Sequence, residues 1–79
     1  MKPLQADKVI DCIGLFCPMP IVKTAQQLNE MKEGEVLEVI ADDKGIKSDM
    51  PAWTAKTGHK LLGIEEHDGE FHVFVKKKA

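Results

Sequence analysis

The dipeptide Asp68-Gly69 separates two stretches of alternating apolar and polar residues near the end of the chain. Asp-Gly favours the backbone conformation of a two-residue hairpin turn. We therefore predict antiparallel strands over 60–66 and 70–76, with His67 opposite Glu70. This register places four apolar residues on one face of the hairpin, namely Ile64, Phe71, Val73 and Val75.

The preceding residues alternate between strand and helix patterns. Stretches rich in β-branched and apolar residues predict strands over 8–13 and 35–41. A helix is expected to begin at Cys17-Pro18, because proline is tolerated in a first turn. Its apolar residues recur at helical spacing at Ile21, Val22, Ala25, Leu28 and Met31. A second helix is expected over 46–57, with Ser48 as an alternative N-cap. Its inward side chains are Ile46, Met50, Trp53 and Thr54.

This order of elements predicts an α/β (α+β) two-layer sandwich with β-α-β-α-β-β topology. The four strands form one mixed sheet, and both helices cover one of its faces. A chain of 79 residues has room for a single domain, which we assign to residues 1–79.

Composition narrows the class of protein. Hydrophobic residues make up 43% and charged residues 30%, which is typical of a folded domain. The 11 basic residues are all lysine and are outnumbered by 13 acidic ones, so we expect no direct binding to nucleic acid. We find no signal peptide and no apolar stretch long enough to span a membrane, and expect a cytoplasmic monomer with reduced cysteines.

Reactive residue types concentrate in one segment, Asp11-Cys12-Ile13-Gly14-Leu15-Phe16-Cys17-Pro18-Met19-Pro20. Cys17 falls at the predicted N-cap of the first helix, where the helix dipole and free amides of Met19 and Ile21 would stabilise a thiolate. The alternative is that Cys17 is a buried packing residue, as free cysteines often are. Its position at a helix start between a turn and two prolines favours the reactive interpretation.

The pattern Asp11-x-x-Gly14-x-x-Cys17-Pro18-x-Pro20 resembles the signature of the TusA/SirA-like sulfur-carrier family. The similarity extends through Gly34-Glu35, Asp42-Asp43 and Asp49-Met50-Pro51 to the terminal hairpin. The resemblance implies a sulfurtransferase whose motif cysteine, here Cys17, accepts sulfane sulfur as a persulfide. It also implies protein partners: a cysteine desulfurase or rhodanese as the donor, and another sulfur-relay protein as the acceptor.

In this interpretation Asp11 and Gly14 shape the loop, while Pro18 and Pro20 set the start of the helix. Family members that serve tRNA thiolation often carry glutamate between the prolines and arginine before the cysteine. This chain has Met19 and Phe16 there. With Leu15 they are expected to surround Cys17 with apolar side chains, which indicates a less polar partner surface. Thiolated tRNA, molybdenum-cofactor synthesis and sulfur oxidation or reduction all remain open as end points.

Cys12 is open to two interpretations. An inward side chain would be a packing residue, which the usual burial of cysteine favours. An outward one would be a candidate resolving thiol that forms a disulfide with Cys17, which requires Cα atoms within about 7 Å. A thiol–disulfide redox module using both cysteines is therefore the main alternative function. A non-catalytic interaction domain is the other.

Two further acidic residues, Asp42 and Asp43, follow the second strand. They belong either to a functional loop or to a solvated turn that caps the next helix. The three histidines and two cysteines lack the spacing of a zinc site, so we predict no metal. Persulfide exchange needs no cofactor, and we expect none.

Overall fold

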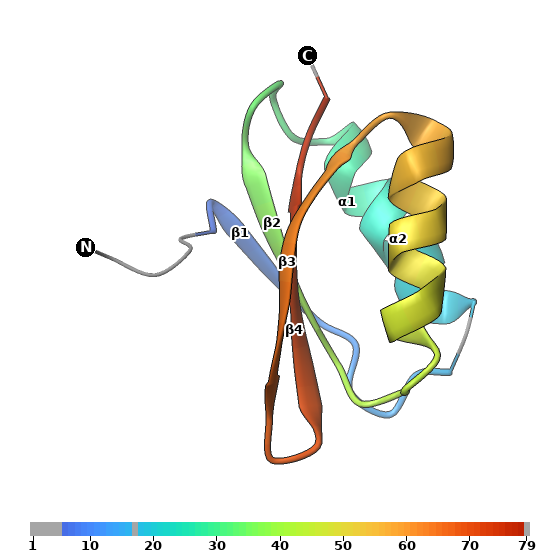
Figure 1. Ribbon diagram of the computed structural model, residues 1–79. Helices are drawn as coiled ribbons and strands as arrows, with labels where there is room; N and C mark the ends of the chain where they lie inside the picture. Colours follow the sequence, from blue (N-terminus) through green and yellow to red (C-terminus); the bar gives the residue numbers. More distant parts are fainter. Residues whose placement is uncertain (1–5, 17, 79) are drawn as a thin grey trace.

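The computed structural model describes residues 6–16 and 18–78 and confirms the predicted architecture. Figure 1 shows a sheet with both helices against one of its faces. The elements are β1 (Lys8–Asp11), α1 (Met19–Asn29), β2 (Val36–Ala41), α2 (Ile46–Thr57), β3 (Lys60–His67) and β4 (Glu70–Lys76). The strand order across the sheet is β1-β2-β4-β3. β1 is parallel to β2, and the other neighbouring pairs are antiparallel.

The C-terminal hairpin has the predicted turn and register. Asp68 and Gly69 both have positive φ, at 51° and 83°, as a tight two-residue hairpin turn requires. His67 pairs with Glu70, so the remaining residues alternate as expected. The residues of β4 that face the helices are therefore buried: Phe71, Val73 and Val75.

The core lies between this sheet face and the two helices. β2 contributes Leu37, Val39 and Ala41, which have no exposed surface, and α1 contributes Leu28. Burying an aliphatic side chain of this size stabilises the folded state by about 1.5–3 kcal/mol. Without a cross-link in the described residues, this apolar layer is the main source of stability, and it fixes α1 over the sheet.

The first strand is shorter than predicted, since β1 ends at Asp11 and the prediction extended it to Ile13. The Cys12 amide still donates to the Ile40 carbonyl at 2.6 Å. The chain then turns, because the Leu15 amide donates back to the Cys12 carbonyl at 3.1 Å. The segment that carries the motif therefore leaves the sheet directly after Cys12.

The start and the buried face of α1 correct two predictions. The N-cap is Pro18, one residue later than the expected Cys17. The predicted buried position Val22 is 39% exposed, whereas Pro20 and Thr24 are buried with Leu28. The polarity of Thr24 argues against a core position. Its hydroxyl donates to the Pro20 carbonyl at 2.7 Å, however, so the buried hydroxyl has a hydrogen-bond partner.

The second helix begins at Ile46, after Gly45, as its apolar pattern predicted. The alternative N-cap at Ser48 is wrong, because the Ile46 amide already donates to the Asp43 carbonyl at 3.1 Å. Met50 and Thr54 lie inward, and Gly58 ends the helix in the left-handed conformation. α2 therefore begins directly after the loop that leaves β2.

Candidate functional site

The motif segment runs from the end of β1 to the first turn of α1. Cys17 itself lies outside the described residues, whereas Phe16 before it and Pro18 after it lie within them. The site is therefore defined by these two neighbours and by the contacts that hold the loop and the helix start.

Two carboxylates hold the loop. Asp11 accepts a hydrogen bond from the Ile13 amide at 2.9 Å through Oδ1. Asp42, at the end of β2, accepts one from the Gly14 amide at 3.0 Å through Oδ1. Gly14 has a φ of 83°, a conformation that costs glycine little. The sequence-predicted residues Asp11, Gly14 and Asp42 are thus brought together, and Asp42 ties the motif loop to the end of the neighbouring strand.

The start of α1 is a tight turn. The Met19 amide donates to the Phe16 carbonyl at 2.8 Å, and the Val22 amide donates to the Pro18 carbonyl at 3.0 Å. The prediction that the Met19 amide is free is therefore wrong, because the turn before the helix uses it. Pro20 is buried within the first turn, where no acidic side chain is present to offset the positive end of the helix dipole. An anionic group at this helix start would be stabilised.

Apolar side chains are exposed around this turn. Phe16 is 75% exposed and Met19 is 42% exposed, whereas Leu15 is half-buried and packs against the core. Ile13 and Val22, which the sequence placed in the first strand and in the buried face of the first helix, are each 39% exposed. These four exposed residues, which we call the apolar rim, include all but one of the exposed large hydrophobic side chains in the described part of the chain.

Asp42 and Asp43 do different things. The exposed Asp42 holds the motif loop, as described above. The Asp43 carboxylate accepts from the Gly45 amide at 3.0 Å, and its carbonyl accepts from the Ile46 amide, so Asp43 forms the turn that starts α2. The starts of the two helices line one narrow crevice. Its lining residues are Pro20, Ile21, Asp43, Ile46 and Asp49.

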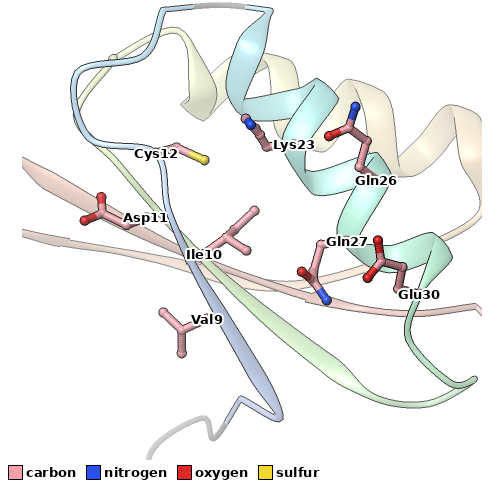
Figure 2. Close-up of a pocket in the computed structure, with 8 residues that line it drawn as sticks. All are labelled: Val9, Ile10, Asp11, Cys12, Lys23, Gln26, Gln27 and Glu30. Atoms are coloured by element: carbon pink, nitrogen blue, oxygen red, sulfur yellow. The ribbon is translucent and has the colours of Figure 1, made fainter.

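Cys12 is a core residue. It is 1% exposed, and burial, reinforced by the charge of Asp11 and opposed by that of Lys23, raises the pKa of its thiol. Figure 2 shows its sulfur directed from the end of β1 toward α1. The surrounding groove, of about 480 Å³, has polar residues of α1 on its other side, including Gln26 and Glu30. The inward alternative for Cys12 is confirmed.

Two lysines of the C-terminal segment have structural roles that the sequence did not reveal. Lys77 Nζ donates to the Met31 carbonyl at 2.7 Å, and Lys78 Nζ donates to the Thr57 carbonyl at 3.0 Å. The Thr57 carbonyl belongs to the last residue of α2, where a cation is favourable, and the Met31 carbonyl lies two residues after the end of α1. The basic tail thus holds the end of α2 and the turn that follows α1.

No three histidine, cysteine or acidic side chains in residues 6–16 and 18–78 are arranged to hold a metal ion. Among the same residues, neither helix has the length and apolar character needed to cross a bilayer.

Comparison with known protein families assigns the chain that carries this motif segment to one family. The family described as "Sulfurtransferase TusA" matches residues 8–77, from the first residue of β1 to the residue after β4. This chain belongs to the TusA family. The family is one of sulfur carrier proteins, and the TusA assignment confirms the resemblance noted from the motif.

Relatives support the TusA assignment over nearly the whole chain. "Sulfur carrier protein TusA" of Allochromatium vinosum is 42% identical over 71 residues, covering 90% of this chain and 93% of its own length. "Putative sulfur carrier protein YrkF" of Bacillus subtilis is 46% identical over 74 residues, covering 94% of this chain. The chain spans only 40% of the length of YrkF.

A solved structure shows the same fold. The crystal structure of a SirA-like protein from Desulfitobacterium hafniense superimposes with a TM-score of 0.79. The match covers 91% of this chain and 99% of that one, at 22% sequence identity. The TusA-type architecture is therefore retained where most residues differ.

Proposed function

We propose that this chain carries sulfane sulfur as a persulfide on Cys17 and relays it to an acceptor protein. The observation that carries the proposal is the TusA match over residues 8–77, which includes the motif around Cys17. The start of α1 adds a physical reason. Cys17 immediately precedes the N-cap of a helix whose first turn holds no acidic residue, and such positions favour a thiolate.

The relay consists of two exchange steps. The Cys17 thiolate attacks the terminal sulfur of a donor persulfide, and the sulfur–sulfur bond of the donor breaks as a new one forms at Cys17. The donor leaves as a thiolate. An acceptor thiolate then attacks the terminal sulfur on Cys17 and releases the Cys17 thiolate. Electrons and atoms balance without an external oxidant, metal or nucleotide.

The donor and acceptor are proposed to be proteins that meet the apolar rim of Ile13, Phe16, Met19 and Val22. A cysteine desulfurase or rhodanese would supply the sulfur, and a further relay protein would take it. The rim exposes large apolar side chains on residues that precede and follow Cys17 in the sequence, so a partner with a complementary apolar surface would exclude water from the exchanging sulfurs. Such a carrier turns over little without its partners. It would work in the reducing cytoplasm, where its thiols stay free.

The burial of Cys12 counts against the redox alternative. A resolving thiol must become a thiolate or be attacked by one, and both need access. Cys12 is 1% exposed, and its pKa is raised by burial. A disulfide with Cys17 would therefore require the end of β1 to open, so the relay is the better-supported function.

The test is the intact mass of the reduced protein after incubation with a cysteine desulfurase and cysteine. The proposal predicts a gain of one sulfur atom that dithiothreitol removes. The gain should be absent in Cys17→Ser and retained in the matched variant Cys12→Ala. A loss of two hydrogens that requires both cysteines would instead support the redox module, and unchanged mass with several donors would support an interaction domain.

A further inference from the structure

Four lysines line one concave surface at the end of the molecule where both helices finish. The hollow has a volume of about 480 Å³ and contains a single acidic residue, Glu33. We call it the lysine cradle; its lining residues are Glu33, Gly34, Gly58, Lys60, Lys76, Lys77 and Lys78. This concentration of positive charge stands out in a chain whose net charge is -2.

Two of these lysines are held in place. The Lys77 ammonium group donates one hydrogen bond to the Met31 carbonyl just after α1, and that of Lys78 donates one to the Thr57 carbonyl at the end of α2. An ammonium has three donors, so each retains two for another partner. The contacts with the helix ends thus fix the positions of two cations at the wall of the hollow without exhausting their hydrogen-bonding capacity.

The other two lysines face each other without a counter-ion. Lys60 of β3 and Lys76 of β4 are directly opposite in the register of the hairpin. Like charges at opposite positions destabilise a strand pair. Neither lysine forms an ion pair with any of the described residues. An anion bound between them would remove this repulsion.

The backbone leaves the cradle open. Gly34 and Gly58 both have positive φ, at 85° and 90°, so neither position readily accepts a side chain. A Cβ atom at Gly58 would lie 3.6 Å from Lys78 Cδ, in contact with the lysine stem. The two glycines therefore keep side chains away from the lysines and leave the hollow accessible.

His59, beside the cradle, is affected by the charges of two of the cradle lysines. The His59 ring accepts a hydrogen bond from the Lys78 amide at 3.1 Å through Nδ1. Burial lowers the pKa of His59, and the charges of Lys78 and Lys77 lower it further. Because a bound anion would offset those charges, the titration of His59 reports directly on occupancy of the cradle.

We propose that the lysine cradle binds a small ligand that carries two or more phosphate groups. Ammonium groups bind phosphate oxygens as point charges, and this chain has no arginine for a planar contact. Four cations around one hollow match several phosphate charges better than a single carboxylate. The volume is within the range of small-molecule sites, roughly 300–1,000 Å³.

The cradle is separate from the proposed persulfide site. α1 runs between them: its first turn follows the motif, and Met31, two residues after its end, contacts Lys77. Its 11 residues correspond to about 16 Å of helix. The ligand therefore does not take part in sulfur exchange, and this inference stands or falls independently of the proposed function.

Binding is tested on the full chain by calorimetry and by NMR titration with pyrophosphate and tripolyphosphate. The double variant Lys60→Gln/Lys76→Gln should bind at least about tenfold more weakly, since two charge-assisted contacts are lost. The control Lys23→Gln/Lys44→Gln makes the same change in net charge away from the cradle and should bind like the wild type. The His59 pKa should rise on saturation of the wild type.

The melting temperature of the double variant shows whether weaker binding comes from a folding defect. Without ligand, the Lys60→Gln/Lys76→Gln variant should unfold at the same or a higher temperature than the wild type, because a cross-strand repulsion is removed. An RNA oligonucleotide without terminal phosphates separates free phosphate compounds from a nucleic-acid backbone. Three results would overturn the proposal: no saturable pyrophosphate binding, equal weakening in the control variant, or binding of RNA without binding of pyrophosphate.

Discussion

The hydrogen bond between Asp42 and the Gly14 amide gives a prediction that separates stability from function. Asp42→Ala removes the acceptor at 3.0 Å and leaves the motif loop without its attachment to the end of β2. Because both groups are exposed, we expect a loss of about 1 kcal/mol in the free energy of unfolding. In a domain of this size that corresponds to a fall of about 4–8 °C in melting temperature.

A second carboxylate provides the matched control. Asp7 accepts a hydrogen bond from the Val36 amide at 2.8 Å through Oδ2, again between the first strand region and β2, but at the other end of β1. Asp7→Ala should therefore cost a similar free energy without disturbing the motif loop. Urea denaturation followed by the fluorescence of Trp53, the only tryptophan in the chain, measures both variants.

The two variants should differ in sulfur transfer. If Asp42→Ala weakens the attachment of the motif loop by about 1 kcal/mol, the fraction of molecules with the loop in place falls by up to about fivefold. The rate of sulfur loading on Cys17 should fall by the same factor. Asp7→Ala should load at the wild-type rate, and Asp42→Asn should retain part of the effect because its amide oxygen can still accept. Equal loss of rate in Asp7→Ala and Asp42→Ala, or a slow Asp42→Ala of unchanged stability, would refute the reasoning.

Three further predictions concern single side chains. Cys12→Ala should lower the free energy of unfolding by about 1–2 kcal/mol near neutral pH. Because the pKa of Cys12 is raised in the folded state, the wild type loses stability as the pH rises above the ordinary thiol range. The difference in the free energy of unfolding between the wild type and Cys12→Ala should therefore narrow. A widening difference would argue against the burial of Cys12. Phe16→Ser and Met19→Ser should change stability by less than about 0.5 kcal/mol and leave loading by polysulfide intact. Transfer to or from protein partners should slow, and unchanged transfer would exclude the apolar rim as their docking surface. Lys77→Met should lower the free energy of thermal unfolding by about 0.5–1 kcal/mol, because the Met31 carbonyl just after α1 loses its cation. An unchanged melting temperature would show that this contact does not contribute to stability.

Local patterns were sufficient to predict the elements. The Asp68-Gly69 turn fixed the hairpin register, because both residues adopt the positive φ that this turn needs. The helical spacing of Ile46, Met50 and Thr54 predicted the bounds and the buried face of α2. These signals depend on neighbours in the sequence, so they can be read without knowledge of the tertiary structure.

The errors lie where distant residues decide the outcome. Thr24 is buried and Val22 is exposed, the reverse of what polarity alone predicts, and the Thr24 hydroxyl is satisfied by the Pro20 carbonyl. Asp42 meets Gly14 across 28 positions of sequence. Lys77 follows β4 and meets the Met31 carbonyl across 46 positions of sequence. These two contacts join residues far apart in the sequence, so no periodicity or local motif predicts them.

The most direct test of the central claim is to locate transferred sulfur on the chain. The protein is loaded from a desulfurase with ³⁴S-labelled cysteine, alkylated, and cut by chymotrypsin after Phe16, which separates Cys12 from Cys17. The account predicts label only on the peptide that begins at Cys17, and loss of that label when an acceptor thiol is added before alkylation. Label on the Cys12 peptide, or label that no thiol removes, would contradict it.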